Sequence, residues 1–122
     1  MHELALSKAL VDALLRAANG RRVTAAHVTV GALYQLDVPA FEREVALLTC
    51  GTPATGVVLD IAVLPAASTC RACGHDWVSP RLPVQCDACG SRDVQAVGGS
   101  EFRLDTITVP ASEAAPEADP NS

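Results

Sequence analysis

The stretch CRACGHDWVSPRLPVQCDACG, residues 70–90, decides how the C-terminal half of this chain folds. It contains two Cys-X-X-Cys-Gly motifs, at 70–74 and 86–90. Two residues between a pair of thiolates allow both sulfurs to reach one ion, and the glycine that follows permits a tight turn, often with positive φ. Because the segment has few aliphatic residues, it cannot build a useful hydrophobic core. We therefore expect a metal ion to hold it together.

A closed tetrahedral metal site needs four ligands, and the two motifs supply Cys70, Cys73, Cys86 and Cys89. Such a site leaves no position for water or substrate, which predicts a structural metal rather than a catalytic one. The donor set favours zinc, while an iron centre of similar geometry and a redox-active dithiol remain alternatives. His75 follows the first motif and is either a solvated loop residue or a group that hydrogen-bonds to a thiolate or enters the site.

Composition narrows the possible partners. The chain has 122 residues, a formal net charge of −5 and 3% aromatic residues. An acidic chain without a basic run has little electrostatic affinity for nucleic acid or anionic lipid, and few aromatic side chains are present to stack bases. No apolar run is long enough to span a membrane, and the N-terminus lacks the features of a signal peptide. We therefore expect a cytoplasmic protein that binds neither nucleic acid nor membrane, and a reducing compartment favours metal over disulfides.

The remaining sequence predicts an α+β fold, with two helices on a three-stranded mixed sheet and a small zinc-ribbon domain inserted before the last strand. Apolar residues with helical spacing predict helices over 3–18 and 39–49. Runs rich in β-branched or alternating apolar residues predict strands over 22–33, 57–64, 94–97 and 102–109. The expected domains are an α/β domain of residues 1–68 plus 101–109, a zinc ribbon of residues 69–100 and a disordered acidic tail of residues 110–122.

The sequence shows none of the arrangements that mark common enzymes. No Ser–His–Asp set, phosphate-binding loop or open metal site is visible, so we do not expect an enzyme. Asp12, Asp37 and Glu42 have the spacing of helix-surface and capping positions rather than of acid–base groups. Cys50 lies at the expected end of the second helix, where we expect a small buried side chain rather than a nucleophile.

His2 is a second position at which metal chemistry is conceivable. A lone histidine at a chain terminus is ordinarily a frayed residue. A free α-amine, the deprotonated amide nitrogen of His2 and its imidazole can instead close a five-membered and a six-membered ring on one metal. This all-nitrogen set suits square-planar Ni(II) or Cu(II). Met1 is normally retained before a residue as large as histidine, so the amine would stay one residue before His2.

Five short motifs occur together in this chain, and their joint occurrence is more specific than any one of them. They are Met1-His2-Glu3 before an amphipathic helix, Val30–Leu33, Thr49–Thr52, Gly56–Ile61 and Gly98–Phe102. Together with the two Cys-X-X-Cys-Gly motifs, this combination resembles the HypA/HybF family of hydrogenase-maturation nickel metallochaperones. The resemblance covers about residues 1–109, which is nearly everything outside the tail. The chain departs from common members in its aromatic-poor core, in residues 34–36 and in the acidic tail.

The resemblance implies a nickel-binding domain and a separate zinc domain. It assigns Ni(II), the cargo, to Met1, His2 and Glu3, with Asp37 as a further ligand or outer partner, although capping of the second helix explains Asp37 equally well. It assigns structural Zn(II) to the four paired cysteines. The resemblance also implies that the protein delivers nickel to the large subunit of [NiFe]-hydrogenase and works with a HypB-like GTPase partner. Some members of the family also serve urease maturation. The alternative function is a zinc-ribbon module that recognises nucleic acid or another protein.

Overall fold

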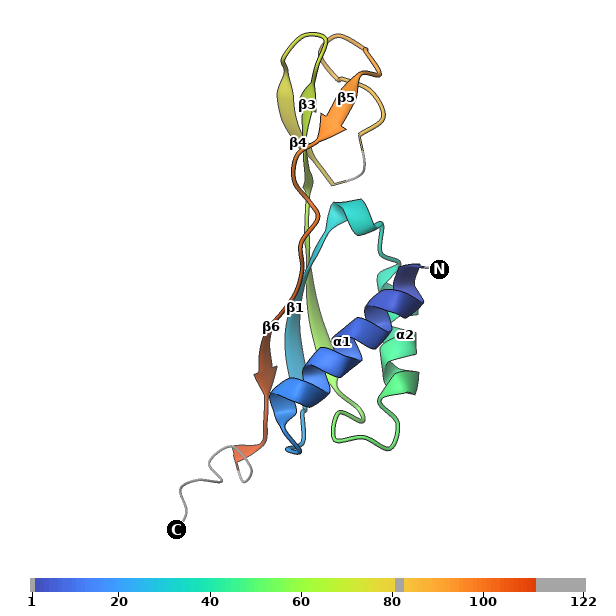
Figure 1. Cartoon of the computed structure of the whole chain (residues 1–122), viewed down its shortest axis with the longest axis vertical. Coiled ribbons are helices and arrows are strands. Elements are labelled where there is room, and N and C mark those ends of the chain that lie inside the picture. The colour runs from blue at the N-terminus through green and yellow to red at the C-terminus, as the bar shows by residue number, and fades with distance from the viewer. Residues whose placement is uncertain (1, 81–82, 112–122) are drawn as a thin grey trace. The chain divides into compact units, whose positions relative to one another are not determined.

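The computed structural model describes residues 2–80 and 83–111 (Figure 1). Two α-helices and a short 3₁₀-helix occur in this part of the chain: α1 (His2–Ala18), η1 (Ala32–Tyr34) and α2 (Val38–Leu48). Six strands occur with them: β1 (Ala25–Gly31), β2 (Val58–Leu64), β3 (Ala66–Cys70), β4 (Asp76–Ser79), β5 (Val94–Ala96) and β6 (Phe102–Thr108). Among the described residues, no helix has the length and apolarity that crossing a bilayer requires.

Both predicted helices are confirmed, and local signals explain their limits. Helix α1 ends where Asn19 takes a left-handed φ of 52°. The Ala18 carbonyl then accepts hydrogen bonds from the Arg21 side chain at 2.8 Å and from the Arg21 N–H at 3.1 Å. Helix α2 begins after Asp37, whose Oδ1 accepts a hydrogen bond from the Ala40 N–H at 3.2 Å. Asp37 is therefore the N-cap of α2.

The predicted three-stranded mixed sheet is also confirmed. Its order is β2-β1-β6, with β1 in the centre. Strand β6 is antiparallel to β1, because Thr24 N–H donates to the Thr108 carbonyl and Gly31 N–H donates to the Glu101 carbonyl. In a mixed sheet the other pair, β1 and β2, is then parallel. The last strand thus returns to the sheet of the first, as the sequence predicts.

The core of this part of the fold lies between the helices and the central strand. Helices α1 and α2 run side by side (Figure 1) and are joined by a hydrogen bond from Ser7 Oγ to Glu44 Oε1 of 2.9 Å. Fully buried apolar side chains come from α1, α2 and β1: Leu10, Leu14, Phe41, Val45 and Val28. With so few aromatic residues in the chain, aliphatic side chains supply most of the buried apolar surface.

A second sheet has three strands, of which the sequence predicted one. It is antiparallel, in the order β4-β3-β5, and it aligns Ser68 of β3 with Trp77 of β4 and Ala96 of β5. Strand β5 was expected, but β3 and β4 were not. The sequence Ala-Ala-Ser-Thr-Cys of β3 carries no apolar alternation, so its strand conformation is set by the hydrogen-bonding partners on both of its sides.

The first predicted strand was too long at both ends. Residues 22–24 lie outside the strand, and residues 32–34 form the 3₁₀-helix η1. The β-branched residues of this stretch end at Val30, and after Gly31 the chain turns. Along β2, burial alternates as far as Ile61, but Val63 is 51% exposed.

The chain forms two compact units. One contains residues 2–28, 37–61 and 104–111, and the other contains residues 29–36, 62–80 and 83–103. The chain passes from one unit to the other within β1, β2 and β6. The domain limits predicted from the sequence stay a prediction. The tail from residue 112 lies outside the described residues.

Two backbone segments meet closely at Gly31 in the second unit. The Gly31 N–H donates to the Glu101 carbonyl at 2.6 Å, and the Leu33 N–H donates to the Gly99 carbonyl at 2.9 Å. A Cβ atom at Gly31 would overlap the backbone of Gly99 and Ser100. Because these neighbours are backbone atoms, no side-chain rotation can relieve the overlap. Glycine is therefore required at position 31.

We predict that Gly31→Ala lowers the free energy of unfolding by about 3 kcal/mol, the upper range for overpacking. Urea denaturation followed by circular dichroism measures the change. Gly20→Ala is the control: nothing lies within 4 Å of its added Cβ, and only its positive φ of 87° is unfavourable. The control should cost about 1 kcal/mol. Equal costs for the two variants would contradict a steric requirement at Gly31.

Candidate metal centre

The two Cys-X-X-Cys-Gly motifs fold in the same way. In the first, the Gly74 N–H donates to the Cys70 carbonyl at 2.8 Å, and in the second, the Gly90 N–H donates to the Cys86 carbonyl at 3.0 Å. Both glycines have a φ of 80°, a conformation that disfavours other residues. We call residues 70–75 the first knuckle and residues 86–91 the second knuckle.

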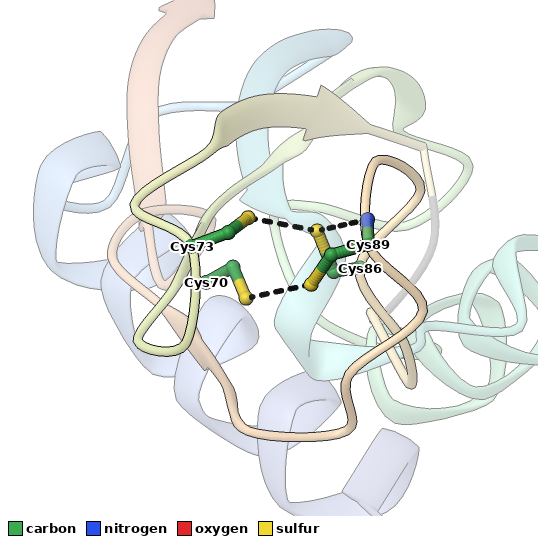
Figure 2. A group of neighbouring side chains, drawn as sticks. All are labelled: Cys70, Cys73, Cys86 and Cys89. Carbon is green, nitrogen blue, oxygen red and sulfur yellow. Dashed lines mark hydrogen bonds between the residues drawn. The ribbon is translucent and has the colours of Figure 1, made fainter.

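The knuckles bring four sulfur atoms together (Figure 2). Cys70 Sγ lies 3.7 Å from Cys89 Sγ, and Cys73 Sγ lies 3.7 Å from Cys86 Sγ. All four ligand atoms lie within 4.8 Å of one another. A tetrahedral ion with metal–sulfur bonds of about 2.3 Å would separate its ligands by about 3.8 Å. The sulfur cluster therefore matches the size of a tetrahedral thiolate site.

The thiols differ in acidity because they crowd one another. Burial raises the pKa of Cys86, but the N–H groups of Cys89 and Ala88 donate to its sulfur at 3.4 Å and lower that pKa to about 6. The N–H of His75 lowers the pKa of Cys73, whereas partial desolvation and the three neighbouring thiols raise it to about 12. One thiolate thus forms readily and another is strongly disfavoured unless a cation compensates the charge.

A divalent cation bound among the four sulfurs would supply this compensation. Within the described side chains, these cysteines are the one group of three or more histidine, cysteine or acidic residues that could hold a metal ion. Cys70 and Cys86 are buried, while Cys73 and Cys89 are exposed at the molecular surface. Four protein ligands complete a tetrahedral shell, so such a centre offers no place for a reacting molecule.

His75 and Trp77 complete the surroundings of the cluster. The His75 ring stacks on Trp77, with centroids 5.4 Å apart and planes at 11°. The His75 Nε2 lies 2.8 Å from Asp87 Oδ1. Of the roles considered for His75, the structure shows neither a free loop side chain nor a bond from its ring to a thiolate. Its partner Asp87 was not singled out from the sequence, where no periodic pattern marks it.

The position of the Cys50 side chain differs from the prediction. It is exposed, whereas we expected a small buried side chain. Its Sγ lies 3.3 Å from the Ala46 carbonyl oxygen at the end of α2. The apolar face of α2 carries Phe41 and Val45, and Thr49 is the buried residue that continues it. The position one residue later therefore faces solvent.

The residues predicted to bind nickel lie at the starts of the two helices. His2 and Glu3 are the first residues of α1, and their side chains are not among those described. Met1 lies outside the described residues. Asp37 caps α2, as described above. Nickel ligation at these four residues stays a prediction.

The fold and the site define a small metal-binding protein in which an α+β unit accompanies a four-cysteine ribbon. A family model described as "Hydrogenase/urease nickel incorporation, metallochaperone, hypA" matches residues 1–109. The chain belongs to this HypA family, which confirms the resemblance seen in the sequence. It is a family of metallochaperones and not of enzymes.

Curated relatives and solved structures agree with this membership. The hydrogenase maturation factor HypA of Geotalea daltonii is 30% identical over 109 residues, covering 89% of this chain and 99% of the relative. That of Thermomicrobium roseum is 31% identical over 124 residues, covering 85% and 94%. The solution structure of the Ni metallochaperone HypA from Helicobacter pylori shares the fold, with a TM-score of 0.56, 21% identity and coverage of 89% and 97%.

We predict that Cys86→Ser abolishes tight binding of Co(II) or Zn(II) at the cluster. The loss in affinity should exceed the roughly 10–100-fold cost of removing an outer partner of a metal ligand. Titration of metal-free protein with Co(II), followed by thiolate-to-cobalt absorption, measures it. Cys50→Ser is the matched control, because Cys50 lies outside the cluster and should leave the titration unchanged. A normal titration of the Cys86 variant would contradict the four-thiolate site.

Proposed function

We propose that this protein holds Ni(II) as cargo at its N-terminus and delivers it for maturation of the large subunit of a [NiFe]-hydrogenase. The observation that carries the proposal is membership of the HypA family over residues 1–109. The family description names nickel incorporation and a metallochaperone, which supports the cargo and the class. The N-terminal sequence Met-His-Glu supplies the donors for nickel.

The position of these donors in the fold supports nickel binding. His2 and Glu3 open α1, and the first N–H groups of a helix have no carbonyl partner within it. Amide nitrogens at this place can lose their protons and bind a metal without breaking helical hydrogen bonds. Together with the amine of Met1 and the imidazole of His2, they form the nitrogen set that square-planar Ni(II) prefers.

We assign Zn(II) to the four cysteines as a structural ion. The sulfur distances of 3.7 Å support a tetrahedral ion with thiolate ligands, and zinc is the usual ion in such closed sites. Its function would be to stabilise the ribbon, since metal binding in such small lobes is also folding free energy. Zinc would thus stay with the protein while nickel is transferred.

Membership of the HypA family also indicates the class of partner. Curated relatives carry the name hydrogenase maturation factor, so hydrogenase maturation machinery is the partner class. Within it we propose a HypB-like GTPase and the hydrogenase large subunit as direct contacts, with the cytoplasm as the compartment where they meet. The family description also names urease, and urease maturation is a second destination for the same cargo.

For Asp37 we predict that stability and nickel binding can be separated. Asp37→Ala removes the cap of α2 and should cost about 1 kcal/mol of stability, whereas Asp37→Ser keeps a capping oxygen and should cost little. Urea denaturation and nickel titration are measured on both variants. Lower nickel affinity in the stable serine variant would identify the carboxylate as a nickel ligand or outer partner. Unchanged affinity would show that the Asp37 carboxylate does not contribute to nickel binding.

The central prediction is that His2→Ala weakens Ni(II) binding by about 100-fold or more, which is about 3 kcal/mol. Calorimetric titration is done on zinc-loaded protein with its native N-terminus, so that the cysteines are already occupied. An N-acetylated chain should lose affinity similarly, because acetylation removes the amine donor. His27→Ala is the matched control, since His27 is an exposed histidine that pairs with Asp60 at 3.0 Å. Full affinity in the His2 variant would refute the proposed nickel site.

A further inference from the structure

A histidine and a carboxylate connect the two knuckles without using a sulfur atom. His75 ends the first knuckle, and Asp87 lies in the second, directly after Cys86. The Nε2–H of His75 donates to Asp87 Oδ1, with the two atoms 2.8 Å apart. Hydrogen bonds of this length to a carboxylate are among the stronger ones in proteins. The side chain of His75 is 38% exposed and that of Asp87 is 63% exposed, so water competes for the bond chiefly at the carboxylate.

His75 is itself firmly placed on the side of the first knuckle. Its backbone carbonyl accepts a hydrogen bond from the Cys70 N–H at 2.8 Å. Its ring stacks on Trp77, which belongs to β4 and is aligned with Ser68 of β3. The imidazole is therefore held by its backbone and by one ring face, and its Nε2 atom is directed to the second knuckle.

The second knuckle depends more on long-range links, because its own hydrogen bonds are internal. The Cys86 N–H donates to the Ser91 carbonyl at 2.8 Å, and the Gly90 N–H donates to the Cys86 carbonyl. Within the described residues, its polar contacts with the first knuckle pass through the cysteine sulfurs and through the bond between His75 and Asp87. This bond is thus a metal-independent connection between the two pairs of ligands.

We propose that His75 and Asp87 are positioning residues that clamp the two knuckles together and slow release of the metal. An ion leaves a four-thiolate site as its ligands detach one after another. While the clamp is closed, a detached sulfur of the second knuckle stays close to the ion, and its high effective concentration favours rebinding. The inference rests on the assignment of a metal to the four cysteines and is independent of nickel delivery.

The test measures how fast Zn(II) passes from the full-length, zinc-loaded chain to an excess of a coloured chelator. Asp87→Ala removes the acceptor, and His75→Phe removes the donor while it keeps an aromatic ring on Trp77. Each variant should release zinc about 10-fold faster, as expected for loss of an outer partner of a metal site. The double variant should be no faster than either single variant, because both changes break the same bond. Asp87→Asn keeps an acceptor oxygen, so this variant should release zinc at close to the wild-type rate.

Asp93→Ala is the matched control. It removes a carboxylate of the same charge from an ion pair with Arg71 of 3.4 Å, but the backbone bond between these residues remains, so the release rate should not change. Co(II)-loaded variants should keep a four-thiolate spectrum, which separates positioning from loss of a ligand. A wild-type release rate in the Asp87→Ala variant, or additive effects of the two single changes, would overturn the clamp. Failure of the unmodified chain to take up zinc would instead overturn the metal assignment.

Discussion

The crowding of four thiols at one point is the constraint on which the ribbon depends, because all four cannot readily ionise together. Backbone N–H groups favour a thiolate at Cys86, while neighbouring thiols resist ionisation at Cys73, and their pKa values of about 6 and about 12 express this conflict. A divalent cation at the centre would resolve it, because such an ion is attracted to every thiolate at once. The strands β3, β4 and β5 around the cluster are short, so this attraction would add stability that their small apolar surface does not supply.

The two proposed metal sites differ in how firmly the chain holds their ligands. The cysteines come from two knuckles, each with its own internal hydrogen bonds, and a sheet supports the first of them. The proposed nickel donors come instead from the first residues of α1, where amide groups lack helical partners. Ligands fixed at several points favour retention of an ion, whereas donors at one chain end can separate from the ion with little rearrangement. This difference suits a protein that keeps one metal and transfers another.

Local signals explain which parts of the fold were predictable. Helix α2 was expected over 39–49 and spans Val38–Leu48. Its start was predictable because the aspartate cap and the proline in the first turn are close together in the sequence. Strand β6 was predicted over 102–109 and spans Phe102–Thr108, and the cysteine cluster was predicted from the spacing of the two motifs. Strands β3 and β4 were missed, because their residues become strands only through pairing with one another. The exposure of Cys50 was missed because one position along a helix changes the face that a side chain occupies.

The sequence by itself determined the four cysteines of the cluster, the two helices to within one residue at each end, and the family, since each depends on residue identity at short spacing. Tertiary structure alone decided which distant residues meet. It placed Gly31 against the backbone of Gly99, and it brought Asp87 to His75 across the two knuckles. Contacts of this kind depend on how separate segments are paired, and no periodicity along the chain encodes them.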